Sequence, residues 1–523
     1  MSRPRCCRAL SLLTLAAALA LPASAQSGNL DIDLVGGAYD GLTQLQLKGT
    51  PSRKYLLLVS VFKSPGLSFI PDQSTDVGTE FLNLSFGIPG FTGVFSGAGT
   101  ASALIVVPYF PQLDTLPLYF QLFETGATGN KLVDKSLVQT LTLQTAGAWK
   151  QPFIGKNYVT QRSTHTMTLL PGEKVLTLGG GIGGITTSYG QDTAEMYDLA
   201  DETLALLGST MQQPRTGHSA TLLDDGRVLI VGGAEDVLGE PTNTAEVYNP
   251  ATGLFSAVGN LLGGPRALHR AIKLDDGRVL VAGGTDNYID PTSILLGAYK
   301  TTEIFNPVTN TFSAGPNMSK PRLGQTLSRL PNGDVLCAGG YTVVTIIFIE
   351  LPVISSDSET YDYQAGLPGA FGNINPMFSQ RMGHGAAVLT DGKVLLAGGA
   401  NGSDPLDPQP ELSWEIFDPA LDFFSVSGPL LDGRILPVVL RLNDGRVLIA
   451  GGAVGSLQMP VSVATCELFE PISQTTAFTG SLAEARAGHE GVLLPDGTVL
   501  VGGGGTSDGV FTDGVTSLEL WQP

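Results

Sequence analysis

The chain has 523 residues, a length that predicts two to four domains or one repeat array with an added domain. Gly (67) and Pro (33) are abundant, 42% of residues are hydrophobic and only 15% are charged, which favours short strands and turns over long amphipathic helices or disorder. The formal net charge of −19 repels phosphate backbones and anionic membranes, so nucleic acid is not expected as a partner.

Residues 1–25 have the pattern of a secretory signal peptide. Arginines precede the apolar stretch LSLLTLAAALAL, which is too short to span a bilayer, and Ala-Ser-Ala at 23–25 matches a small-residue cleavage site. No other run of 18 apolar residues follows, so no membrane span is expected. We therefore expect a mature protein that is secreted and lies in the periplasm or outside the cell. It could be bound to the cell envelope or released from it.

Residues 26–145 carry strand-like runs without a helical period. YLLLVSVF, ASALIVVPYF, LPLYFQLF and LVQTLTLQ are separated by turns of Gly, Pro and Asp. These runs predict a small all-β, sandwich-like domain of immunoglobulin size. An accessory or spacer module is the role expected for it.

The rest of the chain, residues 146–523, repeats one sequence motif. RTGHSATLLDDGRVLIVGG (215–233) contains an Arg, a His, an apolar run, an Asp-Gly turn, a second apolar run and a glycine pair, followed by a third and a fourth strand-like run. The pair recurs every 51 to 59 residues, a period typical of four-stranded propeller blades. Its copies begin at Gly179, Gly232, Gly283, Gly339, Gly398, Gly451 and Gly502.

Two charged positions recur in all seven units, which indicates that they serve the blade, because a single site is needed only once. We expect these side chains to bond each other or main-chain groups; the alternative is a ring of ligand-binding arginines. The arginines are Arg162, Arg215, Arg266, Arg322, Arg381, Arg434 and Arg486. The glutamates are Glu195, Glu246, Glu303, Glu359, Glu415, Glu467 and Glu519.

All five histidines follow a repeat Arg by three residues: His165, His218, His269, His384 and His489. Gln325 and Pro437 fill this position in the other two units. No histidine is left for a separate metal cluster or a nucleophile and base pair, and Cys337 and Cys466 form no zinc-type pair. No catalytic residue can therefore be named, and a disulfide framework is not expected.

These units resemble the kelch repeat over about residues 149–523, through the Arg and His, the apolar hairpin ending in Gly-Gly and the Glu-x-Tyr or Glu-x-Phe that follows. The resemblance implies one four-stranded blade per repeat. The fold class expected is all-β, with a seven-bladed kelch-type β-propeller after the small sandwich. The seventh unit ends within its third strand, so the strand near Trp149 is expected to complete blade seven.

Residues 487–505, AGHEGVLLPDGTVLVGGGG, resemble the last kelch blade of the galactose oxidase and glyoxal oxidase group. In that group a copper-binding Tyr and His open this hairpin. His489 matches the His, but Gly488 stands in place of the Tyr, and the chain ends at Pro523 without the domain that supplies a further His in galactose oxidase. The residues thus favour no cofactor and no metal site, leave calcium open and do not favour copper.

The loops after the glycine pairs differ between the units, which favours them as recognition surfaces. Their carboxylates and aromatic residue suit a glycan or a calcium ion, although Asp is also common in ordinary turns. The candidate ligand-binding residues are Asp286, Tyr288, Asp290, Asp404, Asp407, Asp508 and Asp513. The apolar loop residues 343–349 are a candidate protein-contact patch, with packing against the N-terminal domain as the alternative.

Two functions remain. We expect an exported recognition protein, not an enzyme, that binds a protein or glycan through the loop face of the propeller. The alternative is a carbohydrate-active enzyme, resembling sugar oxidases or isomerases built on kelch propellers, which would rest on fold analogy alone.

Overall fold

The computed structural model describes the strand backbones within 31–150, and residues 157–523 apart from gaps at 183–188, 236–239, 288–295, 347–348, 367, 405–406, 456–458 and 508–510. The chain divides into two compact units, Met1–Ala148 and Trp149–Pro523. The expected signal peptide, residues 1–25, lies outside the described residues.

The N-terminal unit contains two antiparallel sheets. Sandwich packing between them stays a prediction. The first sheet has the order β1 (Asp31–Tyr39), β2 (Leu42–Lys48) and β5 (Thr100–Val106). The second has the order β4 (Thr92–Val94), β3 (Lys54–Ser60), β6 (Pro117–Thr125) and β7 (Leu132–Lys135), with β8 (Gln139–Thr142) also paired to β6.

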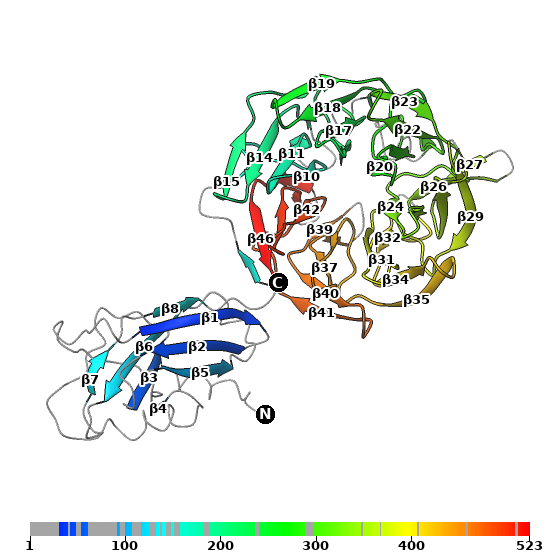
Figure 1. The fold of residues 1–523 in the computed structure, drawn as a ribbon. Helices are drawn as coiled ribbons and strands as arrows, with labels where there is room; N and C mark the ends of the chain where they lie inside the picture. Colours follow the sequence, from blue (N-terminus) through cyan, green and yellow to red (C-terminus); the bar gives the residue numbers. More distant parts are fainter. Residues whose placement is uncertain are drawn as a thin grey trace. The chain divides into compact units, whose positions relative to one another are not determined.

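The second unit is a ring of seven four-stranded antiparallel sheets (Figure 1). In each sheet the first strand is innermost. Blade one contains β10 (Thr166–Leu170), β11 (Lys174–Leu178), β14 (Ala194–Asp198) and β15 (Thr203–Leu206). Blade two contains β16 (Ser219–Leu222), β17 (Val228–Val231), β18 (Ala245–Asn249) and β19 (Leu254–Ala257). Blade three contains β20 (Arg270–Lys273), β21 (Val279–Ala282), β22 (Thr302–Asn306) and β23 (Thr311–Ala314).

The remaining four blades have the same order of strands. Blade four contains β24 (Thr326–Arg329), β25 (Val335–Ala338), β28 (Asp357–Asp362) and β29 (Ala370–Pro376). Blade five contains β30 (Gly385–Val388), β31 (Val394–Ala397), β34 (Ser413–Asp418) and β35 (Phe423–Pro429). Blade six contains β36 (Val438–Arg441), β37 (Val447–Ala450), β40 (Cys466–Glu470) and β41 (Thr475–Thr479). Blade seven contains β42 (Glu490–Leu493), β43 (Val499–Gly502), β46 (Leu518–Gln522) and β9 (Ala148–Lys150).

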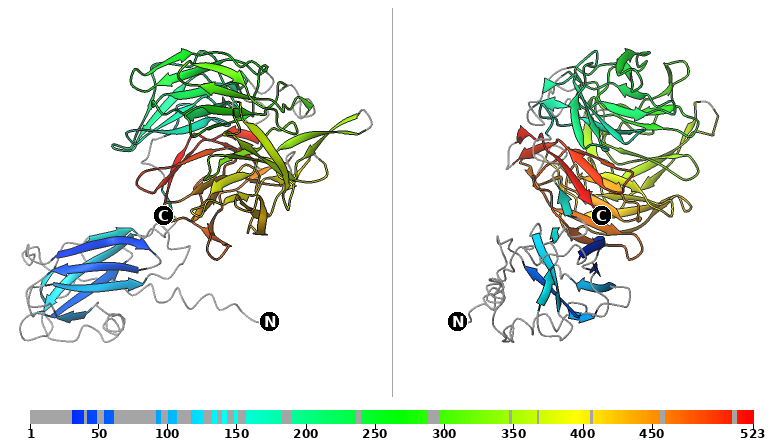
Figure 2. Two further views of the ribbon diagram at one scale, coloured as in Figure 1. Left: turned by 45° about the vertical axis from the view of Figure 1, so that its right-hand side comes forward. Right: turned by 60° about the vertical axis from the view of Figure 1, so that its left-hand side comes forward.

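Among the described residues, the loops after the glycine pairs form short ribbons beyond five of the blades. The ribbon of blade four stands out from the rest of the ring (Figures 1 and 2). The ribbons are β12 (Gly181–Ile182) with β13 (Tyr189–Gly190), β26 (Tyr341–Ile346) with β27 (Ile349–Ile354), β32 (Ala400–Asn401) with β33 (Gln409–Pro410), β38 (Ala453–Val454) with β39 (Val461–Ser462), and β44 (Gly505–Ser507) with β45 (Phe511–Gly514).

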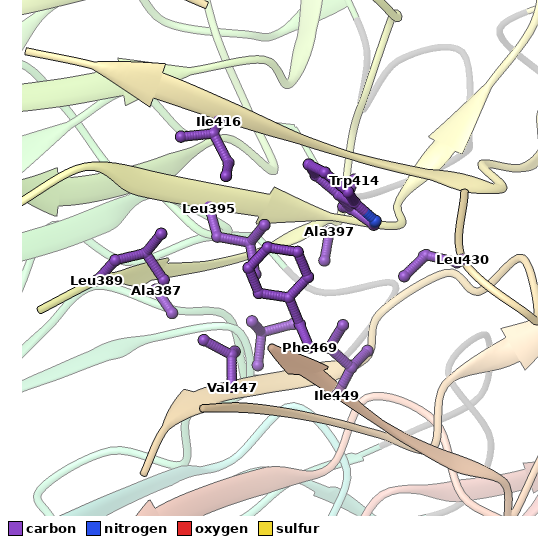
Figure 3. Close-up of a cluster of buried hydrophobic side chains, with 11 residues drawn as sticks. Ala387, Leu389, Leu395, Ala397, Trp414, Ile416, Leu430, Val447, Ile449 and Phe469 are labelled. Atoms are coloured by element: carbon purple, nitrogen blue, oxygen red, sulfur yellow. The ribbon is translucent and has the colours of Figure 1, made fainter. Parts of the chain in front are cut away.

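The hydrophobic core lies between adjacent blades. In blades two to seven the second strand is apolar along its length because both of its faces are covered, as in β31 and β37. Figure 3 shows Trp414 and Leu395 of blade five packed with Phe469 and Ile449 of blade six. These residues are almost fully buried, and the same arrangement joins blade seven to blade one. The predicted seven-bladed β-propeller is thus confirmed.

Blade seven differs from the sequence prediction in the register of its glycine pair. Gly502 is the last residue of β43 and pairs with Glu490, so it corresponds to the residues that end the second strands of the other blades, which are alanines in blades three to six. Gly503 and Gly504, with φ of 63° and 91°, are the actual counterparts of the pairs. The run of four glycines hid this shift of one residue, since any two neighbours fit the pattern.

Candidate functional site

The repeat arginines and glutamates form seven buried ion pairs, one in each blade. In blade two, Arg215 donates from Nε and Nη2 to Glu246 Oε1 at 3.1 and 3.0 Å, and from Nη1 to the carbonyl of Gly232 at 2.7 Å. Both charged side chains are 1% exposed. Each arginine thus ties the third strand of its blade to the turn at the glycine pair, and at Arg215 all three guanidinium nitrogens donate.

Each glutamate also accepts a main-chain N–H from the linker that precedes its arginine. In blade two the donor is Gln212, 3.0 Å from Glu246 Oε2, and in blade five it is Phe378, 2.8 Å from Glu415 Oε2. The carboxylate therefore anchors the inter-blade linker as well as the arginine. Such contacts explain why both charges are tolerated inside the protein, because buried charges need a full set of partners.

The repeat histidines pack against the glycine pair of the preceding blade. A Cβ on Gly179 would lie 2.9 Å from Cε1 of His218, and His165 stands 2.5 Å from the same point on Gly503, which closes the ring from blade seven to blade one. His269, His384 and His489 contact Gly232, Gly339 and Gly451 in the same way. Burial, with the neighbouring charge of Arg215, lowers the pKa of His218 to about 3, so its imidazole is neutral.

The residue just before each histidine position has a left-handed backbone. Its φ is 51° at Thr164, 55° at Leu268 and 54° at Leu436, and four glycines fill the other blades. Main-chain N–H groups of these residues donate to the matching carbonyl of the preceding copy, as in Leu268 to Gly217 at 2.9 Å and Leu436 to Gly383 at 2.9 Å. The blades are thus joined at the loop face by main-chain hydrogen bonds around the ring axis.

The residue just after each histidine position is the first residue of the innermost strand, and we call it the axial position. Its seven occupants are Thr166, Ser219, Arg270, Thr326, Gly385, Val438 and Glu490. Three hydroxyls bond the imidazole Nε2 of the next blade: Thr166 to His218 at 3.0 Å, Ser219 to His269 at 2.8 Å, and Thr326 to His384 at 2.9 Å. In those blades the axial residue belongs to the contact between blades.

Arg270 and Glu490 are the two charged axial residues. Arg270 is exposed and donates from Nε to the carbonyl of Gln325 at 3.2 Å. Glu490 is half-buried; burial raises its pKa to about 7, and the positive charge of Arg270 opposes that shift. Their strands, β20 and β42, lie on opposite sides of the ring centre (Figure 1). The two residues therefore begin innermost strands on opposite sides of the axis, and the charge of Arg270 acts on Glu490.

The loop candidates that the structure describes lie on the face with the ribbons. Asp286 is exposed and accepts a 3.0 Å hydrogen bond from the hydroxyl of Tyr299, whose ring lies 5.2 Å from Cζ of Arg266. Asp404 is exposed, and Asp407 is half-buried. The two are linked by a 3.3 Å hydrogen bond from the N–H of Asp407 to the carbonyl of Asp404. The structure thus places these residues in separate blades, three and five, and not in one cluster.

Several other candidates cannot be placed in this way. Tyr288, Asp290 and Asp508 lie outside the described residues, and for Asp513 only the backbone, in β45, is described. Within the candidate patch 343–349, Val343 and Val344 are half-buried, and side chains from 345 onward are not described. The roles predicted for these residues remain predictions.

A cavity of about 390 Å³ lies on the opposite face, between the hairpin turns of blades three, four and five. Asp275, Arg329 and Asp391 are its charged lining residues, and Arg329 Nη1 lies 2.7 Å from Asp275 Oδ1. This ion pair is partly exposed and joins two neighbouring turns. The cavity adds no further polar cluster to the site.

No family model matches the chain. Two galactose oxidases of Gibberella zeae, one from strain PH-1, are each 24% identical over 296 residues, which are 52% of this chain and 41% of each relative. The chain thus spans about 41% of the length of these relatives. A solved structure described as a novel fungal alcohol oxidase of the AA5 family in complex with copper aligns with a TM-score of 0.55 and 16% identity, over 72% of this chain and 76% of that one.

The chain has a galactose oxidase-like propeller fold. These relatives and neighbours are oxidases, and the solved one contains copper. The sequence-based expectation of no cofactor, with copper not favoured, is therefore contradicted by the comparisons. It went wrong because it weighed the missing tyrosine at Gly488 above the similarity of the whole propeller.

The described residues do not supply a set of ligands for such a metal. No group of three or more His, Cys, Asp and Glu side chains that could hold an ion occurs among them. His489, which matches the copper-binding histidine of the oxidases, is buried against Gly451 and has no hydrogen-bond partner on either ring nitrogen. One imidazole fits a metal, but the rest of a ligand set is not found in the described part of the chain.

Sequence reasoning missed Arg270 and Glu490, although a signal was present. Both follow the histidine position directly, and a column of the seven copies at that position contains only two charges. The signal is a departure from the repeat at a position that the other blades use for the scaffold.

No helix in the described residues is long and apolar enough to cross a membrane.

Proposed function

We propose that the protein is an exported recognition protein that binds a glycan through the loop face of its propeller. One observation carries the proposal: the exposed carboxylate of Asp286 is held by the hydroxyl of Tyr299, and the Tyr299 ring is supported by the buried Arg266. A fixed carboxylate beside an aromatic ring offers a hydrogen-bond acceptor and an apolar face. These two features complement the hydroxyl groups and the C–H face of a sugar.

The scaffold explains how such a site is positioned. The strand that leaves each glycine pair bridges back to the residue after the repeat arginine, as Thr285 does to Ala267 and Gly505 to Ala487. The base of every loop is therefore fixed by main-chain hydrogen bonds, while its tip differs in sequence. The names of the relatives support a sugar as the class of ligand.

A glycan array tests the proposal on the wild type, on a variant with residues 286–290 replaced by Gly and Ser, and on Tyr299→Phe. We expect selective glycan binding by the wild type, its loss in the loop variant, and a weaker signal in Tyr299→Phe because Asp286 loses its donor. Lys320→Ala, outside this loop, is the control. Binding that is the same in wild type and loop variant would contradict the assignment to this loop.

The second candidate is a carbohydrate-active oxidase, which the galactose oxidase similarity favours. Metal analysis after purification and after copper loading, with a peroxide assay on galactose and other primary alcohols, separates the two proposals. Stoichiometric copper together with peroxide release would support the oxidase and contradict the recognition protein. Glycan binding without peroxide release at full copper loading would support recognition.

A further inference from the structure

Arg270 and Glu490 occupy a scaffold position without serving the scaffold. Thr166, Ser219 and Thr326 use the same position to bond the imidazole of the next blade. The side chain of Glu490 makes no hydrogen bond or ion pair with any residue in the described part of the chain, and the imidazole of His165 in the next blade keeps an unpartnered Nε2. The junction of blades seven and one therefore gives up a hydrogen bond that three other junctions have.

Arg270 is also incompletely bonded. Its Nε donates to the carbonyl of Gln325, and within the described residues its two Nη groups have no hydrogen-bond or ion-pair partner. A guanidinium held at one nitrogen presents the other two as a fork, and a planar fork of N–H groups matches a carboxylate in both geometry and charge. The seven repeat arginines, in contrast, have their forks filled by the protein, as at Arg215.

Both groups are open to a solute. Arg270 is exposed and Glu490 is half-buried, so water reaches each, and their strands face each other across the ring centre (Figure 1). A half-buried carboxyl without a side-chain partner, as at Glu490, costs folding free energy, which a bound ligand recovers. The chemistry required of such a ligand is an anion at one end and hydroxyl groups at the other.

We infer that Arg270 and Glu490 form an axial binding site for an acidic saccharide, in which Arg270 binds the carboxylate of a uronic acid and Glu490 hydrogen-bonds its hydroxyls. This inference rests on the proposed glycan recognition and specifies the class of glycan. Hydroxyls suit Glu490 in either protonation state, because they both donate and accept. Carboxylate recognition gives the ring axis a selectivity that the exposed Asp286 cannot supply.

Isothermal titration of the full chain with glucuronate, galacturonate, galactose and inorganic phosphate tests the inference. We expect the uronates to bind, and Arg270→Gln to weaken that binding by about tenfold or more, the effect of losing charge-assisted hydrogen bonds. Glu490→Gln, which keeps the shape and removes the charge, should weaken it less. Arg278→Ala is the matched control, since Arg278 lies in the same blade and pairs with Asp276 at the opposite turn.

The possible outcomes separate this inference from the proposed function. Unchanged uronate binding in a folded Arg270→Gln variant, checked by its thermal unfolding, overturns the axial site. Binding of neutral glycans without uronates overturns the axial site but leaves glycan recognition intact. Phosphate binding that depends on Arg270, without uronate binding, shows an anion site that is not a saccharide site. Absence of binding to any saccharide contradicts both proposals.

Discussion

At the scale of single residues, the buried pair of Arg215 and Glu246 is stable because both charges have a complete set of partners. Glu246 accepts from Arg215 and from the N–H of Gln212, and neither charged side chain is more than 1% exposed. Removing one member of such a group leaves the other charge buried and uncompensated, which costs more than the pair contributed. Exposed ion pairs lack this dependence because water replaces the lost partner.

We predict that Glu246→Gln destabilises the protein by about 3 to 5 kcal/mol, the range for breaking a buried pair. Asp225→Asn, which removes the partner of the partly exposed Arg227, is the control and should cost no more than about 1 kcal/mol. Urea unfolding of both variants gives the free energies. Equal losses would show that burial of the Arg215 pair has no special weight.

The histidine position makes acid stability a second property of single residues. Burial and the charges of Arg215 and Arg162 lower the pKa of His218 to about 3. The unfolded chain takes up a proton below the ordinary value of about 6.5, so this group's contribution to stability is present above that pH and is lost as pH falls toward 3.

We predict that the fall in Tm between pH 7 and pH 4.5 is smaller in His218→Gln than in the wild type, because glutamine does not titrate. The chain supplies the precedent, since Gln325 fills this position in blade four and donates to the carbonyl of Ala282 at 2.9 Å. Gln325→His is the matched control and should steepen the acid dependence. Parallel Tm profiles for the three proteins would contradict the assigned neutrality of the buried imidazoles.

At the scale of the element, the glycine pairs decide how closely the blades approach. A Cβ on Gly232 would lie 2.3 Å from the carbonyl oxygen of Arg266 and 2.9 Å from Cε1 of His269, so the next blade has no room for it. The hairpin glycine Gly226, with φ of 84°, also has a left-handed backbone, but a Cβ there would meet nothing within 4 Å.

We predict that Gly232→Ala lowers stability far more than Gly226→Ala. Both variants place alanine at positive φ, which costs about 1 to 2 kcal/mol, and only the first also forces two blades apart. Thermal unfolding of the two proteins measures the difference. Similar Tm values would show that the conformational cost alone, and not the contact between blades, requires the glycine pair.

At the scale of the whole molecule, the ring of blades is closed at the junction of blades seven and one. β9 is the outer strand of the sheet whose other members are β42, β43 and β46. Leu500 and Leu520 of blade seven pack with Val175 and Tyr197 of blade one. An edge strand left unpaired at this junction would expose main-chain groups to solvent and to other chains.

We predict that Trp149→Pro lowers the Tm and promotes aggregation, because proline removes an N–H and disrupts the pairing of β9. Ser256→Pro, in the outer strand of blade two, is the control, since it damages an outer strand without affecting the closing one. A larger effect of Trp149→Pro in thermal unfolding and light scattering is expected. Equal effects would indicate that closure contributes nothing beyond one outer strand.

The repeated sequence was sufficient to predict the blade, the number of blades and the positions shared by all of them, because a residue needed in every blade must recur at a fixed offset. Turn residues and alternating apolar runs are local properties, and they were identified from neighbours in the chain. The register of the glycine pair in blade seven was missed by one residue, since four successive glycines have no local feature that separates them.

The sequence by itself determined the blade and its repeated contacts, since these depend on residues within about one repeat of each other. Only the tertiary structure decided that the strands that begin at Arg270 and Glu490 lie on opposite sides of the ring centre, and that Asp286 bonds Tyr299 beside Arg266. Closure of the ring brings distant copies of one position around a common axis. A local sequence pattern does not predict which of these copies lie opposite each other. Whether the predicted loop residues cluster was also decided only by the tertiary structure, because the ring places Asp286 and Asp404 in different blades.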